Sequence, residues 1–376
     1  MFDITISIVS YNSKNVIKNC IHSILETTSD IQKEIIVVDN CSEDGSAELV
    51  KTRFPDVRLI ENRENVGFGK AHNQSFRISK GNHFLILNPD TIIFPNAINK
   101  MVEFMDNHKD VGVSGCKIFW DDDKNFMFPD LRIHNLKTSI IQFTPFCSFF
   151  PNSLISKWYW KTAYPLWDTK IPIEVDGITG GLMLVRREAF ESVGFFDENF
   201  FLFFEEHDLL RRIKKGGWEI YYLPDAEIQH YFEESFRNSS IDIDAVYMQS
   251  ALYYYKKHYK IPGYLFIKML LILSKFVHSF ESKTLHSRNM YAEVCPVNSR
   301  LMITWPSQKG AMRYLVEVSY SPSFSDRGGM YVEANTLSLK SDILNRLPNK
   351  TGFLRILPVY TDNSTGKVIQ VIKITK

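Results

Sequence analysis

The feature that most constrains the fold is the alternation of short apolar segments with amphipathic segments along the first third of the chain. Residues 4–9 form an apolar run of strand length, and apolar side chains then recur at helical spacing from Val16 to Leu25. Such alternation is typical of βαβ units, whose helices cover both faces of a mostly parallel sheet. The further elements expected here are strands at 34–38, 57–60, 83–87 and 111–117 and helices at 46–53, 69–78 and 96–108.

Length and composition set the outer limits. A chain of 376 residues exceeds the usual size of one domain, so we expect two. A formal net charge of +1 argues against general nucleic-acid binding. The five cysteines lack any close-paired metal-binding spacing, and the N-terminus enters a strand without a secretory pattern, which together predict reduced thiols in a cytoplasmic protein.

Polar residues follow two of the predicted strands, where open α/β folds place their ligands. Asp39 ends the strand EIIVVD, where its carboxylate can accept a hydrogen bond from a pyrimidine ring or a ribose. Asp90 follows HFLIL, where a carboxylate can bind a divalent cation that neutralises a diphosphate. The alternative for Asp90 is a simple turn, because Asn, Pro and Asp all favour turns. Small residues at 65–69 would allow a ligand to approach the backbone closely.

Two later segments carry further candidates. His230 ends the strand-like EIYYLPDAEIQH, and a neutral imidazole there would suit Mn²⁺ better than Mg²⁺; the alternative is a structural histidine. Glu205, Glu206 and Asp208 stand at the start of a predicted helix. A helix N-terminus favours the charged carboxylate, so we expect Glu206 to accept a proton near neutrality, unless these acids only complement the helix dipole.

A competing acidic cluster occupies 121–123. Three adjacent acids cannot easily all face one ion, and FWDDDKNFMF indicates a hairpin with a charged tip. We therefore predict a solvated turn there.

The order and spacing of these segments resemble the inverting glycosyltransferases of family 2, which have the GT-A fold. The resemblance covers about residues 1–240. Its strongest matches are IVSYNS at 8–13, VVDNCSEDGS at 37–46, NVGFGKAHNQ at 65–74, LNPDT at 87–91, GGLMLVRREAFESVGFFDE at 180–198 and FFEEHDLLRRIKKGGWEIYYLP at 203–224.

The resemblance implies roles for these residues. Asp39 would recognise the base, Asp90 would be the metal-binding aspartate of the Asp-x-Asp element, His230 a late metal ligand for Mn²⁺ or Mg²⁺, and Glu206 the catalytic base, with Glu205 and Asp208 as rivals. The residues expected around the nucleoside diphosphate sugar donor are Ser10, Tyr11, Asn12, Asp39, Asn40, Gly67, Phe68, Lys70, Asn73, Asn88, Pro89, Asp90, Gly180 and Gly181.

Two departures refine the expectation. Asn88 replaces the first acid of the Asp-x-Asp element, which leaves one carboxylate for the metal, and Glu206 is one methylene longer than the family's usual aspartate. The form LNPDT resembles the branch that contains rhamnosyltransferases of bacterial surface polysaccharides. That branch implies a dTDP- or UDP-sugar donor, with rhamnose favoured, and a glycan acceptor that is often polyprenyl-linked.

The rest of the chain falls into three segments with different sequence patterns. The aromatic stretch at 134–170 is assigned to acceptor binding. A helical segment at 241–289 is too short and too charged in its apolar part to span a bilayer, so it either lies on a membrane surface or bridges domains. Residues 290–376 alternate as strands and resemble a fibronectin type III module, with Trp305 and Tyr314 in its core.

The predicted architecture is therefore an α/β GT-A nucleotide-diphospho-sugar transferase domain with a mixed Rossmann-like sheet at 1–240, the helical segment, and an all-β immunoglobulin-like sandwich. Peripheral contact with the cytoplasmic membrane face and a homo-oligomer are both compatible with it. The alternative function is a catalytically inactive module that binds or assembles glycans through the β domain.

Overall fold

The computed structural model describes residues 2–28, 30–127, 135–143, 166–231, 241–285, 292–294, 300–319, 327–340, 351–361 and 365–375. Contacts divide the chain into two compact units. The first comprises residues 1–118, 130–134 and 169–265, and the second comprises 119–129, 135–168 and 266–376. The boundaries expected from the sequence, 1–240, 241–289 and 290–376, stay a prediction.

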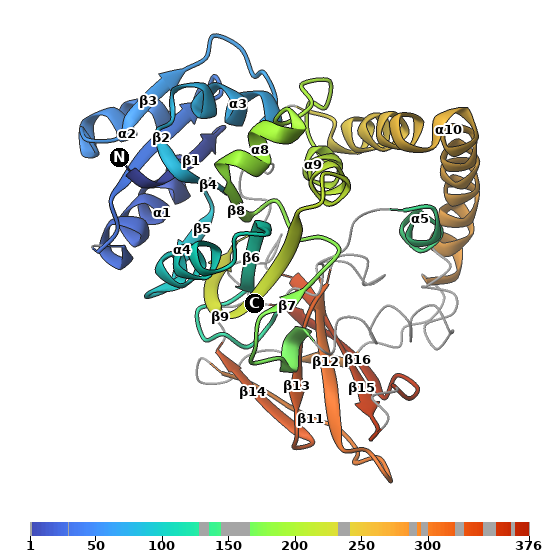
Figure 1. Ribbon diagram of the computed structural model, residues 1–376. Helices are drawn as coiled ribbons and strands as arrows, with labels where there is room; N and C mark the ends of the chain where they lie inside the picture. Colours follow the sequence, from blue (N-terminus) through green and yellow to red (C-terminus); the bar gives the residue numbers. More distant parts are fainter. Residues whose placement is uncertain are drawn as a thin grey trace. The chain divides into compact units, whose positions relative to one another are not determined.

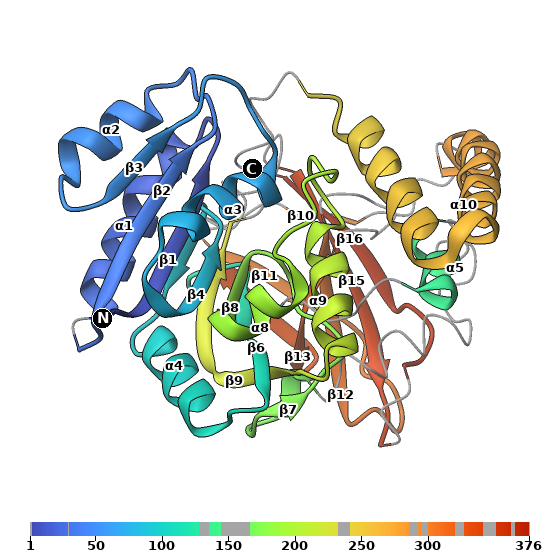
Figure 2. The ribbon, with the colours of Figure 1, turned by 45° about the horizontal axis from the view of Figure 1, so that its top comes forward.

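The first unit is built on a mixed sheet, whose parallel part is seen side by side in Figure 2. The strand order is β3-β2-β1-β4-β8-β6-β9-β5, with β7 paired to β9. Strands β3 to β4 in this order are parallel, whereas β8 is antiparallel to both β4 and β6. The sheet is thus mixed, as the resemblance implied. The mostly parallel sheet that the periodicity predicts corresponds to the four strands β3, β2, β1 and β4. The strands are β1 (Phe2–Ser10), β2 (Lys33–Asp39), β3 (Arg58–Glu61), β4 (Gly81–Leu87), β5 (Thr91–Ile93), β6 (Val111–Phe119), β7 (Ile173–Glu174), β8 (Leu182–Arg186) and β9 (Glu219–His230).

The helix α1 illustrates how an apolar stripe packs a helix against the sheet. In α1, Ile17, Cys20, Ile21 and Ile24 are buried at the spacing of one helix face. The interior strand β4 is buried almost throughout, as expected for a strand covered on both faces. The helices of this unit, labelled in Figure 1, are α1 (Lys14–Thr27), α2 (Ser46–Arg53), α3 (Phe68–Ile78), α4 (Ala97–Asn107), α8 (Arg187–Val193) and α9 (Glu205–Lys215).

The long helix α10 (Ile243–Leu285) follows β9 and contains the point at which the two units divide. Its backbone leaves helical geometry at Lys260, where φ is 61°. Pro262 stands two residues later, a position that the first turn of a new helix tolerates. No helix among the described residues meets the length and hydropathy needed to cross a bilayer.

The second unit contains a five-stranded sheet, β10-β16-β15-β12-β13, and a two-stranded sheet, β11-β14. Trp305 and Tyr314 are buried as predicted, with ring centroids 5.4 Å apart. The resemblance to a fibronectin type III module stays a prediction. The elements are α5 (Leu136–Phe143), β10 (Ala292–Val294), β11 (Arg300–Thr304), β12 (Arg313–Ser319), β13 (Arg327–Val332), β14 (Thr336–Lys340), β15 (Thr351–Val359) and β16 (Gln370–Thr375).

Two expectations for the middle of the chain change. Most of the aromatic stretch lies outside the described residues, but Trp167 is buried and its ring lies 5.5 Å from that of Tyr331 on β13. Trp167 therefore packs within the second unit. The acidic run is only partly solvated, since Asp121 is 6% exposed and accepts hydrogen bonds from the backbone of Asn125 and Phe126.

Candidate active site

Asn88, Asp90 and His230 meet at one point of the first unit. The strand β5 pairs with β9 so that Thr91 lies opposite His230, which brings the turn after β4 to the end of β9. His230 Nε2 lies 3.0 Å from Asp90 Oδ1 and 3.2 Å from Asn88 Nδ2. Asp90 and His230 are each about 4% exposed. Residues 140 positions apart in the sequence thus share one buried polar junction.

The donor atoms of this junction fit a divalent cation. Asp90 supplies a carboxylate and His230 an imidazole, both suitable for Mn²⁺ or Mg²⁺. The amide nitrogen of Asn88 faces His230, so the Asn88 oxygen would bind a cation only with the amide turned over. The described residues contain no group of three His, Cys, Asp or Glu arranged around one ion. A cation at this junction would thus have two strong protein ligands and need oxygens from its substrate, as is usual for Mg²⁺ bound to phosphates.

The two glycines before β8 connect this junction to the acids of α9. A Cβ added at Gly181 would lie 2.7 Å from His230 Nδ1, closer than real side chains approach. A Cβ added at Gly180 would lie 3.5 Å from Glu206 Cγ, an ordinary contact. Adjacent α-carbons are about 3.8 Å apart. Glu206 therefore lies beside Gly180 and His230 beside the next residue, Gly181.

The acids of α9 lie in different environments. Glu205 is buried, and burial followed by the charge of Glu206 raises its pKa well above the usual range. Burial also raises the pKa of Glu206, to about 7. The helix terminus alone was expected to favour the charged form, so burial has overridden that effect. A carboxylate with a pKa near 7 is suited to general base catalysis at neutral pH.

Asp208 is bound by two cationic side chains and a histidine. Its Oδ2 accepts from Arg212 Nε at 2.8 Å, and its Oδ1 lies 2.8 Å from His258 Nε2 and 2.7 Å from Lys257 Nζ. Burial by itself would raise the pKa of Asp208, but the hydrogen bond from His258 and the charges of Arg212 and Lys257 lower it to about 2. Asp208 thus holds α10 against α9 as a permanent anion.

The loops after β1 and β2 carry the residues that were predicted to bind the nucleoside. Ser10 and Asp39 are register partners on parallel strands, and both are buried. Asp39 Oδ1 accepts from the Ser42 backbone at 2.9 Å, while burial raises its pKa. Asn12 Oδ1 accepts from the Glu43 backbone at 2.9 Å and so ties these two loops together. The neighbouring Tyr11 is half-buried.

Several residues predicted to bind the donor also hold neighbouring loops together. Asn40 Oδ1 accepts from the Val66 backbone at 3.0 Å, and Asn40 Nδ2 donates to the Gly67 carbonyl at 3.3 Å. Gly67 has φ +90°, and a Cβ there would meet the Phe201 carbonyl, so only glycine fits. Phe68 donates its backbone N–H to the same carbonyl at 2.8 Å.

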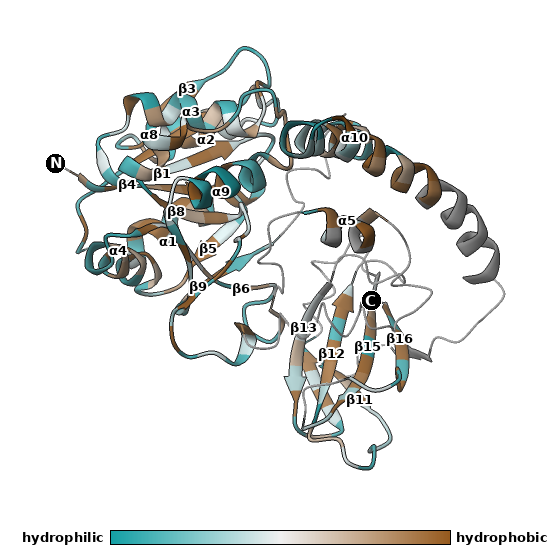
Figure 3. Ribbon diagram, turned by 45° about the vertical axis from the view of Figure 1, so that its right-hand side comes forward, coloured by the Kyte–Doolittle hydropathy of each residue, from teal (hydrophilic) through white to brown (hydrophobic). Residues whose placement is uncertain are grey.

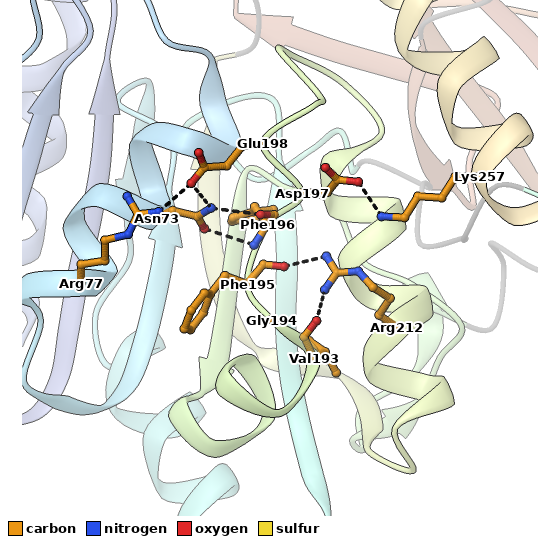
Figure 4. A pocket seen from close by; sticks show the side chains of 10 residues that line it. All are labelled: Asn73, Arg77, Val193, Gly194, Phe195, Phe196, Asp197, Glu198, Arg212 and Lys257. Atoms are coloured by element: carbon orange, nitrogen blue, oxygen red, sulfur yellow. Dashed lines mark hydrogen bonds and ion pairs between the residues drawn. The ribbon is translucent and has the colours of Figure 1, made fainter.

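Asn73 is part of a second group of polar contacts. It donates to and accepts from the backbone of Phe196, at 3.0 and 3.1 Å, and donates to Glu198. These contacts line a cavity of about 450 Å³, shown in Figure 4. Arg77 there pairs with Glu198 at 2.8 Å and Lys257 pairs with Asp197 at 2.7 Å. The cavity thus marks where residues 193–198 are attached to α3, α9 and α10.

Lys70, also predicted for the donor, is half-buried on α3 and lowers the pKa of Glu198 through its charge.

One neighbour of the candidate base was not singled out from the sequence. His207 Nε2 lies 3.8 Å from Glu206 Oε1, and burial lowers the pKa of His207 to about 3, which keeps it neutral. Its position directly after two glutamates at a helix start was the available signal. A neutral imidazole there leaves the charge of Glu206 uncompensated.

The comparisons with known proteins agree with this architecture. The family model described as "Glycosyl transferase family 2" matches residues 5–194, half of the chain. The chain belongs to this family. An N-acetylglucosaminyl-diphospho-decaprenol L-rhamnosyltransferase of Mycobacterium tuberculosis is 29% identical over 213 residues, covering 52% of this chain. The chain spans 66%, just under two thirds, of that relative's length. The succinoglycan biosynthesis protein ExoO of Rhizobium meliloti is 34% identical over 106 residues, covering 28% of this chain and 30% of the relative.

Solved structures give weaker likenesses. A mannosyltransferase from Pyrobaculum calidifontis in complex with GDP-Man and Mn²⁺ matches with a TM-score of 0.42 and 16% identity, covering 77% of this chain and 81% of that one. The S. aureus TarS fragment 1–349 with UDP-GlcNAc matches with a TM-score of 0.45 and 16% identity, covering 72% and 70%. At these scores the likeness adds nothing to the family assignment.

Proposed function

We propose that this protein is a metal-dependent inverting glycosyltransferase. It would move a sugar, with rhamnose favoured, from a dTDP- or UDP-linked donor to a hydroxyl of a growing bacterial surface glycan. The family membership supports the reaction class, and the likeness to the rhamnosyltransferase supports a role in glycan biosynthesis. Rhamnose and a polyprenyl-diphosphate-linked acceptor are proposed by analogy with that relative. The observation that carries the proposal is the Gly180–Gly181 step, which has Glu206 beside one glycine and His230 beside the next.

The donor would lie at the carboxyl edge of the sheet. Asp39 would receive a hydrogen bond from the base or ribose, with Ser10 beside it, since these two buried residues end neighbouring parallel strands. Asp90 and His230 would hold Mn²⁺ or Mg²⁺, with Asn88 as a weaker third ligand. When bound, the cation supplies positive charge that stabilises the departing diphosphate.

The acceptor would react on the side of α9. Glu206 takes the proton from the acceptor hydroxyl, whose oxygen forms a bond to the anomeric carbon while the bond from that carbon to the diphosphate oxygen breaks. Attack opposite the leaving group inverts the anomeric configuration, and no covalent sugar intermediate is needed. Glu206 is favoured over Asp208 because Asp208 is bound by the cationic side chains of Arg212 and Lys257 and by His258. It is favoured over Glu205 because Glu206 is the acid beside Gly180 and the less buried of the two.

The direct test is release of free nucleoside diphosphate from a panel of dTDP-, UDP- and GDP-sugars. Purified protein is supplied with Mn²⁺ or Mg²⁺ and with lipid-linked or free saccharide acceptors, with and without a chelator. We expect release that depends on acceptor and metal, and a product whose anomeric configuration by NMR is opposite to the donor's. Release that survives chelation would refute metal dependence. Silence across all donors and acceptors would favour the alternative, a glycan-binding module that acts through the β strands of the second unit.

A further inference from the structure

The turn at 88–90, which carries Asp90, is joined to other parts of the first unit by backbone hydrogen bonds. The Asn88 N–H donates to the Gly181 carbonyl at 3.0 Å, and the Tyr231 N–H donates to the Asp90 carbonyl at 2.9 Å. These bonds connect the turn to the segment before β8 and to the end of β9. They use main-chain groups alone, so they leave open what the side chains around the turn contribute.

Two buried side chains hold the Asn88 carbonyl of the same turn. Thr91 Oγ1 donates to this carbonyl at 2.8 Å, and Cys20 Sγ, a weaker donor, lies 3.6 Å from it. The same sulfur lies 3.5 Å from Thr91 Oγ1. Thr91 and Cys20 are both 0% exposed. Since a buried polar group that loses its partner is costly, these three contacts favour one geometry of the turn.

Cys20 reaches the turn because helix α1 lies beside strand β5, as Figure 3 shows. Ser23 follows Cys20 by three residues and therefore stands on the same face of α1. Ser23 Oγ accepts the N–H of Ile93 at 3.0 Å and donates to the Cys20 carbonyl at 2.7 Å. The helix thus contacts β5 at both Thr91 and Ile93, and it fixes the position of this short strand.

The position of β5 decides where the two candidate metal ligands lie. Asp90 directly precedes Thr91, and Thr91 is the register partner of His230. The hydrogen-bond partners behind metal ligands commonly set metal affinity. We propose that Thr91 and Cys20 are positioning residues. They hold the 88–90 turn so that the Asp90 carboxylate stays beside the His230 imidazole, where the cation is proposed to bind. This inference rests on the metal dependence of the proposed function.

Binding of Mn²⁺ tests the proposal without the need for sugar transfer. Free Mn²⁺ is measured by electron paramagnetic resonance while the full chain is added, in the presence of UDP or of dTDP. Thr91→Val keeps the size of the side chain but removes the hydroxyl, so we expect Mn²⁺ affinity to fall about tenfold. Thr91→Ser restores the hydroxyl donor and should bind Mn²⁺ as tightly as the unaltered protein does.

Thr28→Val is the matched control. Thr28 is also 0% exposed, and its Oγ1 donates to the Ile24 carbonyl at 2.5 Å, at the C-terminal end of α1 and eight residues beyond Cys20. This substitution removes the same group from an equally buried position, so it should affect stability similarly and leave Mn²⁺ affinity unchanged. Cys20→Ala should weaken Mn²⁺ binding about threefold, as expected for one weak hydrogen bond, and Cys20→Ser should recover it.

Circular dichroism and thermal melts compare the folding of the variants. A folded Thr91→Val protein with unchanged Mn²⁺ affinity would overturn the proposal. Equal losses of affinity in Thr91→Val and Thr28→Val would do the same, because the effect would then follow general stability, as would a serine variant as weak as the valine variant. An unaltered protein that binds no Mn²⁺ with either nucleotide would refute the proposed metal dependence and this inference with it. The expected Mn²⁺ affinities in a protein that transfers no sugar would refute the proposed enzyme function alone.

Discussion

Glu206 and Asp208 stand in the same first turn of α9 and have opposite proton affinities. Burial raises the pKa of Glu206 to about 7, and its near neighbours include the neutral His207. Asp208 is also buried, but His258, Arg212 and Lys257 lower its pKa to about 2. The two carboxyl groups share a helix dipole, so the dipole does not distinguish them. Fixed cations do.

This difference separates a reactive acid from a structural one. A base must be able to gain a proton near the working pH, which Asp208 cannot do while Arg212, Lys257 and His258 bind it. Glu206 is beside Gly180 and has a pKa near neutrality. The following experiments perturb one acid or its surroundings and compare the consequence with the other.

The largest effect is expected for Glu206→Gln. The amide keeps the shape of the side chain but cannot accept the proton, so transfer should fall by about 10²- to 10⁴-fold. Donor binding, measured by calorimetry with metal present, should be unchanged. Glu205→Gln is the matched control and should retain most activity. If Glu206→Gln transfers sugar at the full rate, the role of catalytic base would be assigned to Glu205.

Asp208→Asn should act on stability instead. The variant leaves Arg212, Lys257 and His258 around a buried neutral amide, and we expect the free energy of unfolding to fall by about 3 kcal/mol. Denaturant titration measures it. The control is Asp176→Asn, whose 81% exposed side chain pairs with Lys214 and should contribute less than about 1 kcal/mol. Equal losses in both variants would show that the partners of Asp208 do not stabilise the fold.

Gly181→Ala and Gly180→Ala test the two glycines that lie beside His230 and Glu206. The Cβ at 181 would displace His230, so metal-dependent donor affinity should fall by about 10- to 100-fold, as for other disturbances of metal ligands. The Cβ at 180 makes an ordinary contact with Glu206 and should leave donor affinity unchanged. Isothermal titration with the donor and Mn²⁺ compares the two. Equal donor affinities in the two variants would show that His230 does not contribute to donor binding.

The smallest effect is expected from pH. Since Glu206 must lose its proton before it can accept another, kcat/KM should be level above about pH 7 and fall about tenfold for each unit below it. Asp208, with its pKa lowered to about 2, would stay ionised across this range. Rates from pH 5.5 to 8.5, with circular dichroism to verify folding, measure the profile. A level profile down to pH 5.5 would exclude Glu206 as the base.

The strands and helices of the first third agree with the sequence periodicity to within two residues at their ends. Periodicity did not reveal the antiparallel part of the sheet, because a strand's apolar pattern does not record the direction of its neighbour. The sequence predicted which residues belong to the candidate site but not the contacts that each of them makes. Asn40 and Asn73 were expected at the donor, and their amides bind backbone groups of other loops. Asn is suited to both tasks, so its identity alone could not decide between them.

The sequence by itself determined the alternation of strands and helices, the order of the family 2 motifs and the residue types available for the chemistry. These are local properties, set by side-chain spacing and by turn residues. Only the tertiary structure decided that Asp90 and His230 touch, that a glycine step joins them to Glu206, and which acid of α9 titrates near neutrality. Those outcomes depend on burial and on hydrogen-bond and charge partners such as Lys257 and His258, which lie some fifty residues further along the chain than Asp208. Proton affinity is set by the groups that surround an acid in space.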